Sequence, residues 1–160
     1  MSGAVSLDSF NNAATEDAMA VMMSCCSSKR FAAVMAAGRP YPDLAAAEAA
    51  ITAAFESLDW ADVLEAMAGH PRIGDRAKGQ SAAEQSGVAD SSRAALAGGN
   101  REYEERFGHV YLICATGLSG EEMLAALRER LGNDPDTERK VATTELRKIT
   151  VLRLGKVLGS

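Results

Sequence analysis

The stretch Ser119–Val157, SGEEMLAALRERLGNDPDTERKVATTELRKITVLRLGKV, decides the fold class. It carries two helix-start signals, separated by a short polar break. Ser119 and Glu122 have capping-box spacing, which predicts a helix beginning directly after Ser119. Asp134 followed by Pro135 is typical of an N-cap and the first helical position, and predicts a second helix that runs to the end of the stretch. We therefore expect two consecutive helices here.

Outward from this stretch, similar signals predict helices through most of the chain. N-cap residues, apolar periodicity and glycine or proline stops recur from about residue 15 onward. Gly98–Gly99–Asn100 is expected to interrupt one helical region, and His109–Ala115 is expected to be extended because it is rich in β-branched and aromatic residues. The remaining predicted helices are 15–25 with Thr15 as N-cap, 28–37, 43–58, 59–68, 81–96 and 101–107.

The composition supports a single all-α domain covering residues 1–160. The 160 residues suffice for one hydrophobic core, and 47% of them are hydrophobic against 24% charged, which is typical of a globular chain. Thirty alanines stand against eight aromatic residues, and alanine is the strongest helix former. We therefore predict a compact domain of about seven to nine helices.

Charge and cysteine content exclude several classes of function. The net charge of −5 gives no basic footprint for nucleic acid or an anionic membrane surface. The longest apolar runs are far shorter than the roughly 20 residues of a membrane-spanning helix. The three cysteines, two of them adjacent, show neither disulfide-framework nor zinc-site spacing. We expect reduced thiols, a cytoplasmic protein and no metal site.

Two short motifs could carry chemistry. His70 is followed by Pro71, which biases it away from the helical region and presents a fixed imidazole suited to general acid or base work. The same motif also reads simply as the end of a helix. Ser81 and Glu84 fit a capping box, but Glu84 and Gln85 could equally project into a cleft at a helix start, where free N–H groups favour an anion.

The last predicted helix carries an arginine among apolar residues. Ala142, Leu146, Ile149 and Arg153 fall at i, i+4, i+7 and i+11, which places Arg153 on the apolar stripe. Such an arginine either extends its charged end to solvent or holds an anion in a pocket. The second histidine, His109, is interpreted as structural or exposed.

Taken together and in order, these motifs resemble the 2-oxo-4-hydroxy-4-carboxy-5-ureidoimidazoline (OHCU) decarboxylase family. The resemblance runs from about Leu7 to Leu158, and the His-Pro-Arg-Ile-Gly and Ser-x-x-Glu-Gln motifs are its most specific parts. The residues that carry it are Phe10-Asn11-x-Ala13, Cys25-Cys26-Ser27-Ser28, Arg39-Pro40-Tyr41, His70-Pro71-Arg72-Ile73-Gly74, Ser81-x-x-Glu84-Gln85, Tyr103-x-x-x-Phe107-Gly108, Ile113-Cys114-Ala115-x-Gly117 and Glu145-Leu146-x-Lys148-Ile149-x-x-x-Arg153-Leu154.

The resemblance implies an all-α homodimer that needs no metal or organic cofactor. It implies decarboxylation of OHCU to (S)-allantoin, the last step in converting urate to (S)-allantoin. It assigns His70 and Glu84 as catalytic residues. The substrate-binding residues that it implies are Pro71, Ser81, Gln85, Ile113, Ala115 and Arg153.

Two other interpretations compete with this one. The first is a non-enzymatic helical module that binds a partner protein through the methionine-rich stretch Met19–Met23. The second is an enzyme that acts on a related ureide or hydantoin. Neither explains why His70, Glu84, Gln85 and Arg153 occur together.

Overall fold

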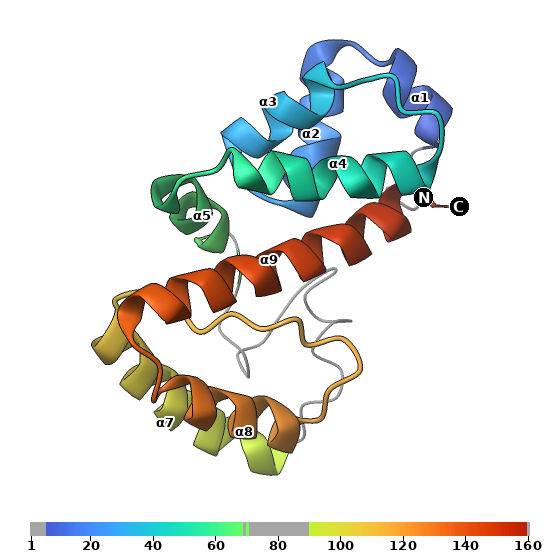
Figure 1. Ribbon diagram of the computed structural model, residues 1–160. Coiled ribbons are helices and arrows are strands. Elements are labelled where there is room, and N and C mark those ends of the chain that lie inside the picture. The colour runs from blue at the N-terminus through green and yellow to red at the C-terminus, as the bar shows by residue number, and fades with distance from the viewer. Residues whose placement is uncertain (1–5, 69, 71–89, 160) are drawn as a thin grey trace. The chain divides into compact units, whose positions relative to one another are not determined.

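The computed structural model describes residues 6–68, 70 and 90–159, and every regular element in these ranges is an α-helix (Figure 1). Eight helices are present there, in agreement with the predicted all-α class. The chain forms two compact units, residues 1–66 with 147–160 and residues 67–146, which we call unit 1 and unit 2. Each unit is described separately. The expectation of one domain over 1–160 stays a prediction.

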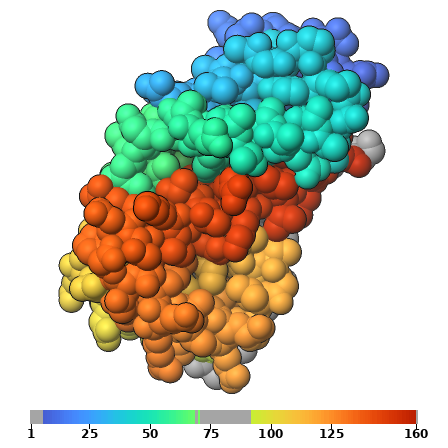
Figure 2. Space-filling model, in the orientation of Figure 1, coloured from blue at the N-terminus to red at the C-terminus, as the bar shows by residue number. Residues whose placement is uncertain are grey.

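Unit 1 is built from five helices and the second half of a sixth. They are α1 (Leu7–Asn12), α2 (Thr15–Cys25), α3 (Lys29–Ala37), α4 (Leu44–Glu56), α5 (Trp60–Met67) and the later part of α9 (Pro135–Leu158). Fully buried Phe10, Met22, Phe31 and Ile51 form its core, and the side chains of α1 to α4 make one continuous surface on the face shown in Figure 2. Each of α1 to α4 thus contributes a fully buried side chain to unit 1.

Arg39 ties the first helix of unit 1 to the third. Its Nη1 donates to the Phe10 and Ala13 carbonyls at 2.9 and 2.7 Å, and its Nε donates to the Ala36 carbonyl at 2.8 Å. Nearby, the Tyr41 hydroxyl donates to the Met35 carbonyl at 2.7 Å. One guanidinium therefore satisfies carbonyls at the C-terminal ends of both α1 and α3, where helices leave acceptors unpaired.

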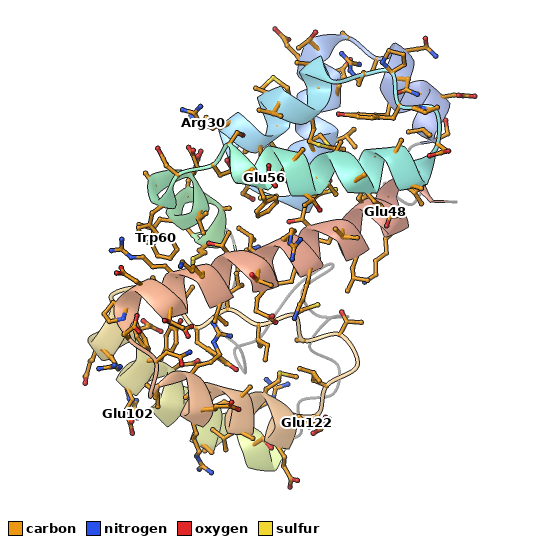
Figure 3. The ribbon with its side chains drawn as sticks, in the orientation of Figure 1. Arg30, Glu48, Glu56, Trp60, Glu102 and Glu122 are labelled. Atoms are coloured by element: carbon orange, nitrogen blue, oxygen red, sulfur yellow. The ribbon has the colours of Figure 1, made fainter. Side chains whose placement is uncertain are left out.

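Unit 2 contains α7 (Asp90–Phe107), α8 (Gly120–Arg130) and the first half of α9. Its core consists of Leu96, Tyr103, Tyr111, Ile113, Ala115, Met123 and Leu127. The exposed carboxylates of Glu102 on α7 and Glu122 on α8 point outward (Figure 3). Within the described residues, no helix is long and apolar enough to span a membrane.

Most of the predicted helix starts are confirmed. The Ser28 and Asp43 side chains accept from the Phe31 and Ala46 amides, at 3.2 and 2.8 Å. Ser119 and Glu122 form the complete capping box, and the Asp134 side chain accepts from the Thr137 amide at 2.8 Å. The predicted 81–96 helix is described only from residue 90, so its start lies outside the described residues.

Three expectations about helices were wrong or incomplete. Thr15 is the first residue of α2 and not its N-cap, because the cap position falls on Ala14, which has no side-chain acceptor. Gly98–Gly99–Asn100 does not interrupt the helix, since α7 continues through these three residues. The short helix α1 was not predicted, although the Ser6 side chain caps it by accepting from the Ser9 amide at 3.0 Å.

Candidate functional site

The structure describes four of the eight predicted site residues. His70, Ile113 and Ala115 belong to unit 2, whereas Arg153 belongs to unit 1. Three of the four therefore belong to one unit, and Arg153 belongs to the other. The other four predicted residues, Pro71, Ser81, Glu84 and Gln85, lie outside the described residues.

His70 is half-buried and lies just beyond the end of α5. Its backbone N–H donates to the Met67 carbonyl at 3.0 Å, which satisfies one of the acceptors that the helix end leaves unpaired. This hydrogen bond fixes the backbone of His70 relative to the last turn of α5. The predicted effect of Pro71 on the imidazole of His70 falls outside the described residues.

Residues 110–115 run without helix, turn or bend, which agrees with the predicted extended stretch 109–115 except at His109, where the chain bends. Tyr111, Leu112, Ile113 and Ala115 are nearly fully buried, at 1%, 3%, 7% and 4% exposure. The segment ends in a turn in which the Leu118 amide donates to the Ala115 carbonyl at 3.0 Å. Gly117 in that turn has a φ of +82°, a left-handed conformation that favours glycine.

Within the described part of unit 2, three hydrogen bonds that involve side chains hold this segment. The Tyr111 hydroxyl donates to the Met123 carbonyl at 2.9 Å. Arg130 Nη1 donates to the Leu112 carbonyl at 2.7 Å. The Cys114 amide donates to Oε1 of Glu145, on α9, at 3.0 Å. Buried backbone groups normally have partners, and here polar side chains replace a sheet ladder.

Behind the segment lies a buried charged group that we call the Arg130–Glu138 cluster, made of Tyr103, Tyr111, Arg130, Asn133 and Glu138. Arg130 Nε and Nη2 both donate to Glu138 Oε2, at 2.8 and 2.5 Å, and the Tyr103 hydroxyl also donates to it. Asn133 Nδ2 donates to the other carboxylate oxygen at 3.0 Å. The Arg130 guanidinium stacks over the Tyr111 ring at 4.8 Å.

Burial dominates the electrostatics of the two tyrosines in this cluster. It raises the pKa of Tyr103, and the hydrogen bond to Glu138 raises that pKa further. Burial likewise raises the pKa of Tyr111, while the positive charge of Arg130 opposes the rise. Both phenols therefore stay protonated through the neutral range and act as hydrogen-bond donors.

The sequence analysis missed the Arg130–Glu138 cluster. The sequence feature that could have indicated this cluster is the apolar stripe of the last helix. Glu138 stands four residues before Ala142 and so extends that stripe by one turn. An acidic residue at a core-facing position calls for a buried partner.

Arg153 is buried, at 8% exposure, on the same face of α9 as Leu146 and Ile149. This confirms its predicted place on the apolar stripe. Within unit 1, burial raises the pKa of both Cys25 and Cys26 to about 11, and the charge of Arg153 opposes this rise. The two thiols are therefore protonated and unreactive at neutral pH.

The remaining sequence expectations concern His109 and metals. The half-buried His109 ring lies against Tyr103 at 5.4 Å, edge to face, which supports a structural role. Within the described ranges, no three His, Cys, Asp or Glu side chains are grouped as metal ligands. The expectation of a metal-free site stays a prediction.

The sequence model of one family, OHCU decarboxylase, matches residues 11–155. The chain is 35% identical over 147 residues to the uric acid degradation bifunctional protein TTL of Arabidopsis thaliana, covering 84% of this chain and 45% of that protein. It is 36% identical over 138 residues to 2-oxo-4-hydroxy-4-carboxy-5-ureidoimidazoline decarboxylase of Amia calva, covering 79% of each. The chain thus spans about half the length of the bifunctional relative and most of the other.

Two solved structures share the fold. A crystal structure of OHCU decarboxylase in the presence of (S)-allantoin has a TM-score of 0.76 at 34% identity, covering 92% of this chain and all of that one. A crystal structure of (S)-allantoin synthase has a TM-score of 0.75 at 17% identity, covering 96% and 54%, and shows the fold alone. Fold and sequence together define a member of an all-α class of decarboxylases. The chain belongs to the OHCU decarboxylase family.

Proposed function

We propose that the chain decarboxylates OHCU to (S)-allantoin, the last step in the breakdown of urate to allantoin. The observation that carries this proposal is the family match over residues 11–155, joined to 36% identity with a named OHCU decarboxylase. The His70 and Ser81–Gln85 motifs fall inside the matched region. The buried extended segment 110–115 supplies a rigid backbone for a small polar substrate.

The chemistry can proceed without an organic cofactor because the substrate itself provides the electron sink. The carboxylate of OHCU is attached to a carbon that bears a hydroxyl group. When the bond to the carboxylate breaks and CO₂ leaves, its electron pair forms a double bond to the adjacent ring carbon, whose C=N electrons move onto the ring nitrogen, which takes up a proton, and an enol-like intermediate results. Delivery of a proton to one face then sets the (S) configuration. The protein positions the substrate, stabilises charge and directs that proton.

Each proposed site residue has a role in this scheme. His70 acts on the substrate hydroxyl and drives the collapse to CO₂, while Glu84 orients His70 and polarises the ring N–H groups. Arg153 binds the carboxylate or a carbonyl and stabilises developing negative charge. The remaining residues contact the ureido and ring amides through side chains or backbone, and these are Pro71, Ser81, Gln85, Ile113 and Ala115.

The test follows the handedness of allantoin formed from urate by circular dichroism. The mixture contains urate oxidase and hydroxyisourate hydrolase, with or without this protein. We expect a rapid (S)-allantoin signal with the protein, against slow racemic product without it. No change in rate or handedness with folded protein would contradict the proposal. Competition by other ureides or hydantoins would identify an enzyme of related specificity.

Replacing the catalytic base tests the site itself. We expect His70→Ala to lose nearly all of the acceleration, about 100-fold or more, because a positioned acid or base contributes that much. The (S)-allantoin dichroism signal measures the loss, and the far-ultraviolet helical signal of the variant serves as the control for folding. Full activity in a folded His70→Ala variant would remove His70 from the mechanism.

Assembly and location complete the proposal. The family resemblance supports a homodimer, which sedimentation equilibrium can measure. Free Cys25, Cys26 and Cys114 support a reducing compartment such as the cytoplasm. The competing binding-module interpretation has little support in α2, because Met22 is fully buried and Met19 and Met23 are half-buried.

A further inference from the structure

One buried arginine on α8 holds the backbone of the extended segment 110–115. Arg130 Nη1 donates to the Leu112 carbonyl at 2.7 Å, while Nε and Nη2 of the same guanidinium donate to Glu138. Arg130 is 6% exposed and Leu112 is 3% exposed, so bulk water does not compete for the carbonyl. A hydrogen bond from a charged donor is shorter and stronger than one from a neutral donor. Arg130 thus gives the Leu112 carbonyl a strong hydrogen bond.

The surroundings of Arg130 fix the direction in which it donates. Its partner Glu138 also accepts from the Tyr103 hydroxyl and from Asn133, so the carboxylate is held from several sides. The guanidinium is planar and its N–H groups form a rigid fork. It also lies over the Tyr111 ring at 4.8 Å. With Nε and Nη2 bound to the carboxylate, Nη1 therefore points in one direction, toward the segment.

Holding the Leu112 carbonyl also sets the direction of the N–H group of Ile113. The peptide bond between these two residues is trans, and a peptide unit is planar, so its C=O and N–H groups lie in one plane and point in opposite directions. A turn of the Leu112 carbonyl would therefore turn the Ile113 N–H by the same angle. Ile113 is one of the residues for which we propose contact with the substrate.

We propose that Arg130 is a positioning residue: by holding the Leu112 carbonyl, it aims the Ile113 N–H at a ureido or ring carbonyl of the substrate. This inference rests on the proposed function, which includes Ile113 in the substrate site. Arg130 acts through the peptide unit between Leu112 and Ile113 and is not itself a catalytic residue.

The experiment compares Arg130→Lys with Tyr103→Phe in the whole 160-residue chain. Arg130 uses three nitrogens for its two partners, whereas lysine has a single nitrogen, which the buried Glu138 carboxylate retains. The Leu112 carbonyl then loses its donor. Tyr103→Phe is the matched control, because phenylalanine keeps the ring and removes only the hydroxyl that donates to Glu138. It weakens the same buried cluster and leaves the hydrogen bond to Leu112 in place.

We expect Arg130→Lys to raise the KM for OHCU about tenfold, the effect of weakening one well-placed binding contact. The kcat should change by no more than about threefold, because a misdirected N–H weakens binding of the substrate and of the transition state alike. Tyr103→Phe should keep both constants within about threefold of the wild type, although its unfolding temperature falls. Progress curves of the dichroism signal, recorded where each protein is folded, give both constants.

Nuclear magnetic resonance reports on the peptide unit itself and is independent of activity. Leu112–Ile113 is the only leucine followed by isoleucine in the sequence. Labelling leucine carbonyls with carbon-13 and isoleucine amides with nitrogen-15 therefore singles out this peptide bond. We expect its carbonyl signal to move in Arg130→Lys and to keep its position in Tyr103→Phe.

A double variant, Arg130→Met/Glu138→Leu, replaces Arg130→Lys if the lysine variant does not fold. It removes both charges together, so that neither is left buried without a partner. Methionine has no donor for the Leu112 carbonyl. We expect the same rise in KM and the same movement of the carbonyl signal.

The possible outcomes separate this inference from the proposed function. A wild-type protein that does not decarboxylate OHCU would overturn the proposed function. An active wild type with an unchanged KM, or an unmoved carbonyl signal, in folded Arg130→Lys would overturn the positioning role alone. An equal rise in KM in Tyr103→Phe would also overturn it, because weakening the cluster would then suffice.

Discussion

Glu138 has no exposed surface, yet its carboxylate accepts four hydrogen bonds from Tyr103, Arg130 and Asn133. Burying a charge is costly unless the geometry of its partners is good and its remaining lone pairs are used. Here the two oxygens of Glu138, on α9, share donors from α7, α8 and the α8–α9 turn. The same arginine also holds the Leu112 carbonyl, so the cluster joins the core of unit 2 to the extended segment.

Neutralising Glu138 should therefore cost stability. We expect Glu138→Gln to lower the free energy of unfolding by about 3 kcal/mol, because it leaves the Arg130 charge buried without a carboxylate. Urea unfolding followed by circular dichroism, at one fixed protein concentration, measures the change.

A surface ion pair supplies the control for this prediction. Arg30 Nε lies 2.9 Å from Asp62 Oδ2, and the Arg30 side chain is 56% exposed (Figure 3). Arg30→Gln should cost less than about 1 kcal/mol, since solvent screens the pair. Equal losses in the two variants would contradict the distinction between buried and exposed charge.

Helix α7 shows how packing overrides a local sequence signal. Gly98–Gly99 lowers helix propensity, which is why an interruption was expected. The helix nevertheless continues, and at Gly99 it approaches α8 closely: an added Cβ would lie 3.0 Å from a methyl group of Leu127. Glycine at position 99 lets α7 pack closely against α8. The packing contact offsets the loss of helix stability that glycine causes.

The neighbouring glycines should respond differently to alanine. An added Cβ at Gly98 meets nothing within 4 Å, so Gly98→Ala should stabilise the protein by up to about 1 kcal/mol through helix propensity. Gly99→Ala should gain less, or destabilise, because the Leu127 methyl groups must move. Thermal unfolding of the two variants tests the difference, and a larger gain at Gly99 would contradict the packing argument.

At the level of elements, the sequence predicted most of what is observed. Helices with polar caps, such as those after Ser28, Asp43 and Ser119, were found because a cap residue is a local signal. Helix α1 was not predicted because its six residues are too few to show a helical period of apolar residues. The family residues Phe10 and Arg39 belong to helix-end contacts, so their place in the motif reflects the fold and not the chemistry.

Ionisation of buried thiols should make the whole molecule sensitive to alkali. The pKa of Cys25 and Cys26 is about 11 in the folded protein, raised by burial from the ordinary 9.0. Between these values the unfolded chain loses protons that the folded chain keeps, so stability falls as pH rises. We expect a loss of about 2 to 3 kcal/mol per thiol between pH 9 and 11.

Unfolding in urea at several pH values measures this loss. The double variant Cys25→Ala/Cys26→Ala is the control, because it lacks both groups and should show a shallower decline. Buried Tyr103 and Tyr111, whose pKa values are also raised, add a decline at still higher pH that the variant retains. Identical slopes in the two proteins would contradict the thiol contribution.

The site is harder to predict from the sequence than the fold. Local patterns placed His70 just beyond a helix end and Arg153 on an apolar stripe, and both positions are observed, whereas the fixed imidazole stays a prediction. Distances between such residues depend on long-range packing. Local periodicity shows which face of one helix is apolar and does not predict these distances. The hydrogen bonds of the Arg130 and Glu145 side chains to the backbone of residues 112 and 114 were also not predicted. A hydrogen bond to a backbone group does not depend on which residue carries that group, so the sequence pattern does not indicate it.

Unit 1 is discontinuous in the chain, since it combines residues 1–66 with 147–160, while unit 2 is the uninterrupted segment between them. This arrangement sets an order on folding during synthesis, when segments leave the ribosome in sequence. Residues 67–146 emerge as a complete set, so unit 2 has all its partners early. Residues 1–66, although made first, must wait for the last turns of α9 to cover their apolar surface. Residues 1–66 thus leave the ribosome before unit 2 but complete their core after it, and they are where a holding chaperone would have most to protect.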